Sequence, residues 1–257
     1  MNNHLLKGKI ALVTGGSSGI GFGTAKRLAE EGAFVYITGR RKDVLENAVA
    51  KLGPFVKGVQ ADISNKADME RLAQIIKDEK GTLDIIFANA GGGKAIPFEE
   101  ATENDYHRTF DVNVWGTYLT VQVMLPLLKE GASIILNASI TAYMGLPGFA
   151  LYAATKAAVR SFARSWTTDF KSLGIRVNAV SPGVIPTEGY EVVQGMSPSA
   201  VQAYKERVSQ EIPLGRVGTS EELGDAVVFL ASDLSKYITG IELTVDGGMT
   251  QVYAGKN

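Results

Sequence analysis

A regular alternation of short apolar runs with helical periodicities constrains the fold of this chain more than any other feature. The apolar runs are mostly continuous, as expected for strands that helices cover on both faces. The predicted strands are Ile10–Thr14, Phe34–Thr38, Phe55–Gln60, Leu83–Ala88, Ser133–Ala138, Ile175–Val180 and Ile241–Val245. The alternation predicts an α/β fold, a single doubly wound parallel sheet of about seven strands with helices on both faces.

No linker, internal repeat or low-complexity segment interrupts this pattern, so residues 1–257 are expected to form a single domain. The exception to the regular spacing is the stretch at about 186–213, which contains Glu188-Gly189-Tyr190 and a helical pattern near Ala200–Ser209. A long insertion after a strand end in such a fold is usually a lid or a binding loop. We therefore predict a substrate lid at about 186–213.

Composition excludes several classes of function. The net charge is -1 and no block of like charges occurs, so neither nucleic acid nor a membrane surface is expected as a partner. The chain has no cysteine, which excludes disulfides, thiolate nucleophiles and cysteine-ligated metals, and no metal site is predicted. The stretch Met1–Lys7 lacks the apolar core of a signal peptide, and no apolar run reaches the ~18 residues of a membrane span. The expected location is cytoplasmic.

A glycine-rich loop, Thr14-Gly15-Gly16-Ser17-Ser18-Gly19-Ile20-Gly21, follows the first predicted strand and opens the first predicted helix. Glycines permit a close approach of the backbone to a phosphate, and a helix N-terminus presents free N–H groups to an anion. At the first strand-to-helix turn of an alternating chain, this loop indicates a dinucleotide site. The structural alternative is a tight turn.

The same loop also matches the G-x-S-x-G pattern of a hydrolase nucleophile elbow, with Ser17 as the nucleophile. Such an enzyme needs an acid and then a histidine downstream. The chain has only His4 and His107, and nothing follows His107 in this role. The hydrolase interpretation is therefore disfavoured, and His107 is expected to be a surface or packing residue on a helix beginning near Thr102.

Tyr152 and Lys156 stand four residues apart, which places a phenol and an ammonium on the same helix face. An adjacent lysine stabilises a phenolate and lowers a phenol pKa that starts near ~10, which yields a proton donor and acceptor near neutral pH. Ser139 closes the apolar run that begins at Ile134. A hydroxyl at a strand end can hydrogen-bond a substrate oxygen as charge develops on it.

With these residues assembled, the chain closely resembles the classical short-chain dehydrogenase/reductase family from Lys9 to about Gly248. The motifs that carry the resemblance are the glycine-rich loop, Asp62, Asn89-Ala90-Gly91, Asn113, Ser139, Tyr152-x-x-x-Lys156, Pro182-Gly183 and Val245-Asp246-Gly247-Gly248. The resemblance implies a Rossmann-type sheet and makes the single domain a dinucleotide-binding and catalytic one.

The resemblance also implies a role for each catalytic residue. Tyr152 would protonate the carbonyl oxygen during reduction, and Ser139 would orient that oxygen. Lys156 would hold the nicotinamide ribose and lower the Tyr152 pKa, while Asn113 would support a proton-relay water. Alternatively, Asn113 is only a buried polar residue that ties two strands together.

Further cofactor contacts are implied in the same way. Besides Tyr152 and Lys156, the predicted cofactor-binding residues are Gly15, Ser17, Ser18, Gly19, Ile20, Gly21, Asp62, Ile63, Asn89, Ala90, Gly91, Pro182, Gly183, Ile185 and Thr187. Asp62 and Ile63 would contact adenine, and the last four would cradle the nicotinamide carboxamide. Asp62 as a turn residue or helix cap, and Asn89 as a buried structural amide, are the alternatives.

The second predicted strand is followed by Gly39, Arg40 and Arg41. An enzyme that uses NAD usually carries an acid here, which binds the ribose 2′-hydroxyl. Guanidinium groups pair instead with a 2′-phosphate, so Arg40 and Arg41 predict NADP rather than NAD. The glycine-rich loop has no basic residue, which weakens this prediction, and the two arginines could simply be solvated charges.

The predicted function is therefore an NADP(H)-dependent oxidoreductase that interconverts a carbonyl and a secondary alcohol, of ketoreductase type. A non-catalytic dinucleotide-binding sensor or scaffold is the alternative. An apolar or aromatic substrate follows from a pocket wall expected to consist of Ile140, Tyr143, Met144, Leu146, Phe149, Val184, Tyr190 and Met196. The resemblance implies a homotetramer, whose dimer surface would use helices around 102–129 and 151–173; core packing would explain several of their aromatic residues equally well.

Overall fold

A computed structural model describes residues 4–192 and 194–252, and it confirms the predicted α/β fold. All neighbouring strands pair in parallel in one seven-stranded sheet of order β3-β2-β1-β4-β5-β6-β7. The strands are β1 Ile10–Val13, β2 Phe34–Gly39, β3 Val56–Gln60, β4 Leu83–Ala88, β5 Leu128–Asn137, β6 Arg176–Pro182 and β7 Glu242–Val245. The helices are α1 Gly19–Glu30, α2 Lys42–Leu52, α3 Lys66–Lys80, α4 Glu103–Phe110, α5 Thr117–Met124, α6 Ala150–Asp169, α7 Gly189–Val192, α8 Pro198–Ser209 and α9 Ser220–Ala231.

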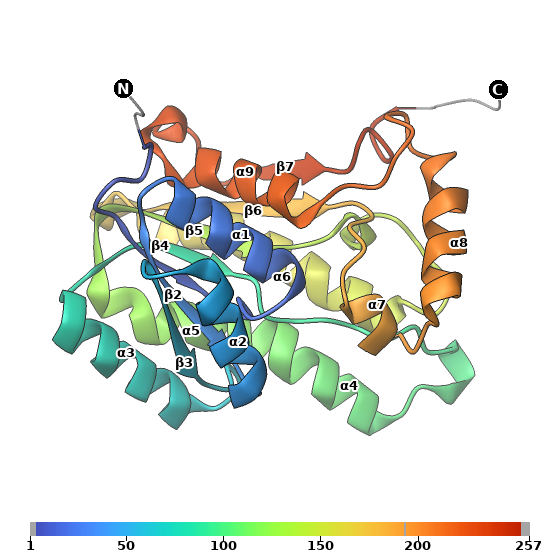
Figure 1. Ribbon diagram of the computed structural model, residues 1–257, viewed down its shortest axis with the longest axis horizontal. Helices are drawn as coiled ribbons and strands as arrows, with labels where there is room; N and C mark the ends of the chain where they lie inside the picture. Colours follow the sequence, from blue (N-terminus) through green and yellow to red (C-terminus); the bar gives the residue numbers. More distant parts are fainter. Residues whose placement is uncertain (1–3, 193, 253–257) are drawn as a thin grey trace.

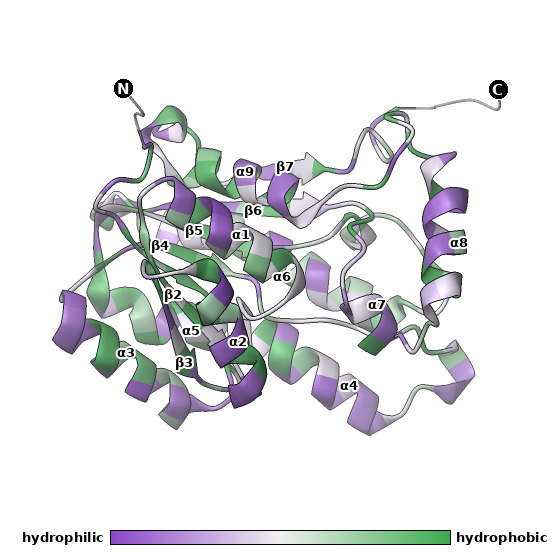
Figure 2. Ribbon diagram, in the orientation of Figure 1, coloured by the Kyte–Doolittle hydropathy of each residue, from purple (hydrophilic) through white to green (hydrophobic). Residues whose placement is uncertain are grey.

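Two apolar layers cover the sheet, one on each face. Along β1, Leu12 joins the core with α3, α5 and α6, whereas Ala11 and Val13 join the core with α1, α2 and α9. This division follows from the alternation of side chains along a strand. Figure 1 shows α1 and α9 packed together over one face, and Figure 2 shows the strands mostly green between helices with purple outer surfaces. The Rossmann-type arrangement is therefore confirmed.

Two helices begin with capping boxes, and the start of one of them, near Thr102, was predicted. The Thr219 hydroxyl accepts a bond from the Glu222 amide at 3.2 Å, and the Glu222 carboxylate accepts one from the Thr219 amide at 2.9 Å. This capping box begins α9. Thr102 and Asp105 form the same reciprocal pair at the start of α4.

The region 102–129 is more divided than the sequence suggests. A π-helical turn, Asp111–Gly116, separates α4 from α5, and β5 begins at Leu128 rather than at the predicted Ser133. Lys129, Glu130 and Gly131 are exposed, which explains why the apolar pattern did not include them. The buried part of β5 starts at Ala132, one residue before the predicted start of the strand.

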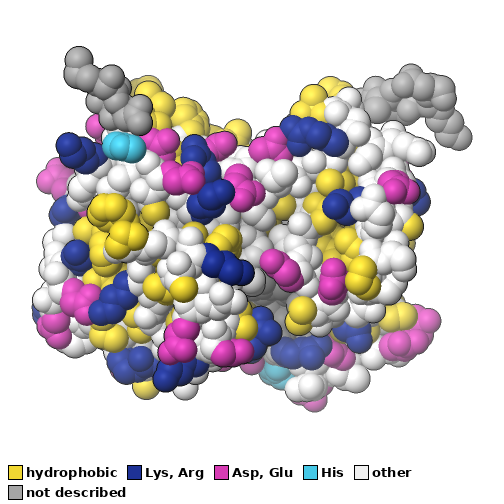
Figure 3. Space-filling view, viewed as in Figure 1, with side chains coloured by type: hydrophobic (Ala, Val, Ile, Leu, Met, Phe, Trp, Pro, Cys, Tyr) yellow, Lys and Arg dark blue, Asp and Glu magenta, His cyan; other side chains and the backbone are white. Residues whose placement is uncertain are grey.

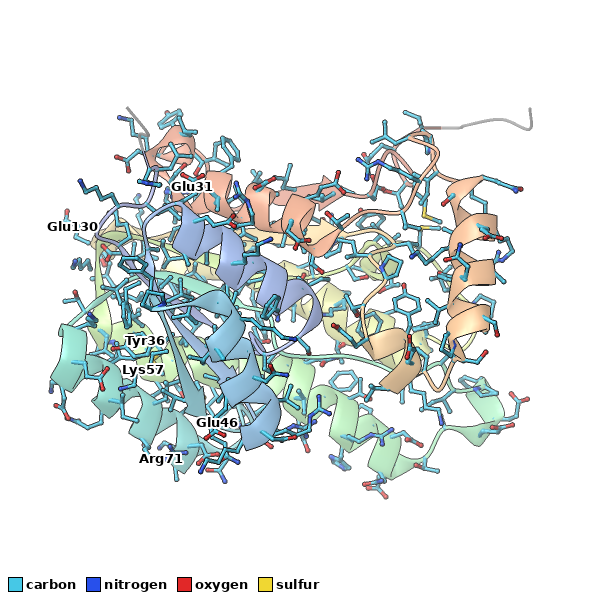
Figure 4. All side chains as sticks on the ribbon, viewed as in Figure 1. Glu31, Tyr36, Glu46, Lys57, Arg71 and Glu130 are labelled. Carbon is cyan, nitrogen blue, oxygen red and sulfur yellow. The ribbon has the colours of Figure 1, made fainter. Side chains whose placement is uncertain are left out.

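A buried tyrosine ties the edge of the sheet to α3. The Tyr36 hydroxyl donates to the Glu79 carboxylate at 2.9 Å, and the same carboxylate pairs with Lys57. Figure 4 shows Tyr36 and Lys57 on neighbouring strands at this edge.

Figure 3 shows cationic and anionic side chains interspersed over the viewed face, with no broad field of one sign. Within the described ranges, no helix is long and apolar enough to cross a membrane.

The stretch 186–213, which contains the predicted lid, consists of α7, α8 and their connections; residue 193 lies outside the described residues. Ser197 caps α8, and Pro198 occupies its first turn, so the helix starts slightly before the predicted Ala200. Only Val208 is buried within α8, where it joins Val184 and Ile212 in a small apolar cluster. Figure 1 shows α7 and α8 at the opposite end of the molecule from α3.

Candidate active site

The structure brings together the three residues with predicted proton chemistry. Tyr152 and Lys156 lie on α6, and the Lys156 ammonium lies 5.5 Å from the centre of the Tyr152 ring. Ser139 caps a short 3₁₀ turn after β5, Ile140–Ala142, and this turn packs against α6. The Ser139 hydroxyl lies close enough to the Tyr152 phenol to lower its pKa.

The protein environment changes the pKa of Tyr152 in the opposite direction from our prediction. Burial raises the pKa of Tyr152 to about 12, and the Ser139 hydroxyl offsets only part of the rise. Burial therefore acts on the Tyr152 pKa in the opposite direction from the effect predicted for Lys156, and that predicted effect stays a prediction. The phenol remains protonated at neutral pH.

Lys156 is buried and is held at the end of β5. Its Nζ donates to the Asn137 backbone oxygen at 2.6 Å. Burial lowers the pKa of Lys156 from its usual 10.5 to about 8, because the charged form loses its water. The lysine therefore still carries its charge at pH 7.

We compare the free energy of unfolding of a Lys156→Met variant with that of the parent. The difference, variant minus parent, should be larger at pH 7 than at pH 10.5. Between pH 8 and 10.5 the unfolded parent binds more protons than the folded parent, so the parent gains stability as the pH rises through this window. The gain corresponds to about 3 kcal/mol, and the variant lacks it. Urea unfolding measures the difference between the two proteins at each pH, and tyrosine ionisation, common to both, cancels. A difference that stays constant with pH would contradict the lowered pKa.

The Asn113 side chain is fully engaged in structural hydrogen bonds. Its oxygen accepts from the Gly92 amide at 3.0 Å, and its nitrogen donates to the Gly92 oxygen and to the Thr155 hydroxyl, both at 2.9 Å. Asn113 lies in the π-helical turn, and π turns are frequent at functional sites. The side chain thus ties the loop after β4 to α6, whereas the structural alternative predicted a tie between two strands, and its proton-relay role stays a prediction.

The glycine-rich loop has the geometry of an anion cradle. Gly15 and Gly19 have φ values of 64° and 53°, in the left-handed region that favours glycine. A Cβ at Gly21 would overlap the Gly15 backbone oxygen. Among the described residues, none supplies a side-chain cap at Ser18, and the first turn of α1 has no acid. The backbone N–H groups in the first turn of α1 are therefore available to an anion, so the glycine-rich loop fits a dinucleotide phosphate.

The predicted nicotinamide side of the cradle lies beside this loop. A Cβ at Gly19 would lie 3.1 Å from Cβ of Thr187, so the chain after β6 touches the loop. A groove of about 370 Å³ runs between them, lined on one side by Gly19 and Phe22 and on the other by Thr187, Glu188, Glu191 and Lys205. The strand ends of β1, β4, β5 and β6 all open toward this edge, as expected at the switch point of such a sheet.

Comparisons with known proteins agree with this geometry. A family model described as "Enoyl-(Acyl carrier protein) reductase" matches residues 15–250. A solved structure from Brucella melitensis, titled a short-chain dehydrogenase/reductase, glucose/ribitol dehydrogenase, superposes with a TM-score of 0.90 at 30% identity, over 96% of this chain and 99% of that one. The chain belongs to the short-chain dehydrogenase/reductase family.

Two curated relatives extend along nearly the whole of this short-chain dehydrogenase/reductase. An oxidoreductase of Sarocladium schorii, asL5, is 43% identical over 96% of this chain and 98% of its own length. An "NADP-dependent (R)-specific alcohol dehydrogenase" of Lentilactobacillus kefiri is 36% identical over 95% of this chain and 98% of its own length. As a member of this family, the protein is an oxidoreductase of a class that uses NAD(P).

Several residues with predicted cofactor contacts have structural partners in this short-chain dehydrogenase/reductase. The Asn89 side-chain nitrogen donates to the Thr14 backbone oxygen at 2.9 Å, and its side-chain oxygen accepts from the Asn137 side chain at 2.8 Å. Asn89 therefore joins three strand ends. Asp62 accepts from the Ser64 amide at 2.9 Å and its hydroxyl at 2.6 Å, as a turn residue does. These bonds match the structural alternatives.

The remaining predicted contacts divide by burial. Ile63 and Ile185 are each 5% exposed and belong to the two apolar cores. Pro182 ends β6, and a Cβ at Gly183 would lie 2.7 Å from Cα of Asp246. Ser18 and Gly91 are exposed, whereas Ser17, Ile20 and Ala90 are half-buried. Their cofactor contacts stay predictions.

Gly93 is the site residue that the sequence analysis missed. A Cβ at this position would lie 2.5 Å from Cδ2 of Tyr152 and 2.6 Å from its Cβ and Cγ. Only a glycine allows the loop to lie flat against this ring. The run Gly91-Gly92-Gly93 was the available signal, but it does not indicate which glycine touches the tyrosine.

Proposed function

We propose that the protein is an NADP(H)-dependent oxidoreductase that interconverts a carbonyl and a secondary alcohol. The observation that carries this proposal is the placement of Tyr152 between a hydroxyl and an ammonium. The Ser139 hydroxyl lies beside its phenol and lowers the pKa of that phenol, and Lys156 lies 5.5 Å from its ring. A non-catalytic sensor or scaffold would not need this arrangement of three side chains.

In this proposal, the Ser139 hydroxyl donates a hydrogen bond to the substrate carbonyl oxygen and orients it. The Tyr152 phenol, protonated at neutral pH, gives its proton to that oxygen as negative charge develops. In the oxidation direction, the tyrosine takes the proton back. A reduced nicotinamide supplies the hydride when it is bound. Lys156 would hold the nicotinamide ribose, and Asn113 would position the loop that lies against Tyr152 and support a proton-relay water.

We further propose that the cofactor phosphates lie on the glycine-rich loop. The free N–H groups of the first turn of α1 support this, since a helix N-terminus is an anion site. The stretch 186–213 would be the substrate lid of a single catalytic domain. From here it is called the lid segment.

The choice of NADP rests on the end of β2. Arg40 and Arg41 are exposed, and neither pairs with a carboxylate of residues 4–192 or 194–252. A Cβ at Gly39 would lie 2.8 Å from the Ser17 hydroxyl, so Ser17 borders the same corner. A hydroxyl and two guanidinium groups can together bind a 2′-phosphate. The name of the L. kefiri relative, an NADP-dependent dehydrogenase, supports the same choice.

Exchanging Arg40 for Asp should lower kcat/KM with NADPH at least about tenfold, because a charge-assisted pair worth roughly 1.5–3 kcal/mol becomes a repulsion. The value with NADH should hold or improve, since an acid accepts from the 2′-hydroxyl. The double variant with Arg41→Asp covers the case in which the two arginines share the phosphate. Lys51→Asp, an exposed change of equal charge at the far end of α2, is the control. A double variant that keeps the NADPH preference would show that the arginines are ordinary surface charges.

The reaction itself is tested by incubating the purified protein with NADPH and a panel of aliphatic and aromatic ketones. We expect NADPH consumption with several apolar ketones and much less with charged ones, because the expected pocket wall is mostly apolar. Tight NADPH binding without turnover on any ketone, and without NADP⁺ reduction by the matching alcohols, would favour the sensor or scaffold instead.

We also propose a homotetramer. Trp115 and Tyr118 are 46% and 39% exposed and stack at 6.0 Å, so they present an apolar face. Trp166, by contrast, is 5% exposed and packs in the core, as the alternative interpretation predicted.

A further inference from the structure

One side chain of the lid segment, Gln194, bonds directly to the loop that lies against Tyr152. Its Nε2 donates to the Gly93 backbone oxygen at 2.6 Å, and its Oε1 accepts from the Ala95 amide at 3.1 Å. Both ends of the amide are thus used on two backbone groups of the same loop. Such a two-point contact fixes the orientation of the side chain as well as its position.

The loop that receives Gln194 is itself held from two other directions. Asn113 bonds both backbone groups of Gly92, and the Ile96 amide donates to the Gly148 oxygen at 2.9 Å. Gly93 lies flat on the Tyr152 ring, where a Cβ would not fit. Gln194 therefore connects the lid segment to a part of the site whose position is already determined.

Gln194 also stands two residues after the end of α7, the helix of the lid segment that carries Tyr190. The backbone N–H of Gln194 donates to the Gly189 backbone oxygen at 3.2 Å, so Gln194 continues the turn of α7. Tyr190, on α7, packs against Tyr204 of α8 with ring centres 5.6 Å apart and ring planes tilted by 39°. Burial raises the pKa of Tyr190, and the Tyr204 and Tyr152 phenols add to the rise, which agrees with a position near Tyr152. Anchoring Gln194 therefore fixes this tyrosine pair beside the site.

We infer that Gln194 is a positioning residue that latches the lid segment over Tyr152 through Gly93 and Ala95. The latch places Tyr190 as one wall of the carbonyl site and restricts water there. The inference rests on the proposed function, because its main readout is carbonyl reduction. It assigns no proton or hydride step to Gln194.

The first test replaces Gln194 with Ala. We expect kcat/KM for the carbonyl substrate to fall about tenfold, since two hydrogen bonds that orient the lid segment are lost. Hydrogen exchange should become faster in 186–192 and 194–197 and remain unchanged in β4 and β5. Gln202→Ala is the matched control, because Gln202 lies on the same segment but bonds only Glu206 on the surface of α8.

A second test uses Gln194→Glu, which keeps the length and the acceptor but replaces the donor. An ionised carboxylate would face the Gly93 oxygen and repel it, whereas a protonated carboxyl can donate to it. The kcat/KM of this variant, divided by that of the parent at the same pH, should therefore rise at least about threefold from pH 8 to pH 5. A purely structural role for the position would not produce this recovery.

The outcomes separate the latch from the proposed function. If the parent reduces no carbonyl compound, the proposed function fails, and faster exchange in the Gln194→Ala variant alone still supports the latch. If the parent is active and Gln194→Ala behaves like Gln202→Ala in both turnover and exchange, the latch is overturned. A pH-independent ratio for Gln194→Glu would overturn the donor contact to Gly93.

Discussion

Replacing Tyr152 with Phe should lower the turnover number for carbonyl reduction by about 100-fold or more, while NADPH affinity stays within about twofold. The substitution removes the only proton that the proposed mechanism transfers, and it retains the ring against which Gly93 packs. Steady-state kinetics gives the turnover number, and fluorescence titration gives the NADPH dissociation constant.

Tyr106→Phe provides the control for loss of a tyrosine hydroxyl, because Tyr106 is 44% exposed on α4 and lies outside the site. It should leave both quantities unchanged. Turnover of Tyr152→Phe within a few-fold of the parent would remove Tyr152 as the general acid. Loss of NADPH binding together with turnover would instead indicate that the phenol mainly holds the cofactor.

Introducing a single methyl group at Gly93 should have an effect of comparable size. In the Gly93→Ala variant the new Cβ would lie 2.5 Å from the Tyr152 ring, so the ring or the loop has to move. A displacement near 1 Å of a reacting group can cost about 100-fold in rate. We therefore expect kcat to fall by this order, with the unfolding temperature reduced by only a few degrees.

Gly92→Ala is the matched control for that experiment. A Cβ at Gly92 meets no described atom within 4 Å, and its φ is not in the left-handed region. The neighbouring substitution should therefore leave kcat within about twofold, and it retains the backbone bonds to Asn113. Equal loss of activity in both variants would mean that general disturbance of the loop, rather than contact with Tyr152, determines the effect.

Much of the fold followed from local pattern. The central strands are buried on both faces, so each appears in the sequence as an apolar run. Their order in the sheet was not predicted, because right-handed crossovers are compatible with more than one order. The start of the helix near Thr102 was also readable, because both bonds of its capping box form within four residues. The start of β5 was missed since Lys129 and Glu130 extend the strand without apolar character.

The site was predictable where it depends on spacing and less so where it depends on packing. The separation of Tyr152 and Lys156 along α6 was enough to place both groups together. The direction of the Tyr152 pKa shift depends on how many protein atoms surround the hydroxyl, which no spacing reveals. The hydrogen bond between Gln194 and Gly93 joins two positions 101 residues apart, and a single sequence carries no signal for it.

The corner between Ser17 and Gly39 has a consequence for how cofactor choice could change during evolution. Any side chain at position 39 would place its Cβ 2.8 Å from the Ser17 hydroxyl, so the two positions share one volume. An acid at position 39, the residue that suits NAD, therefore has to displace Ser17 from its present rotamer. The mutational path with the fewest clashes changes position 17 to a smaller residue first. The two sites should consequently vary together among descendants of this sequence, even though neither contributes to the proton chemistry.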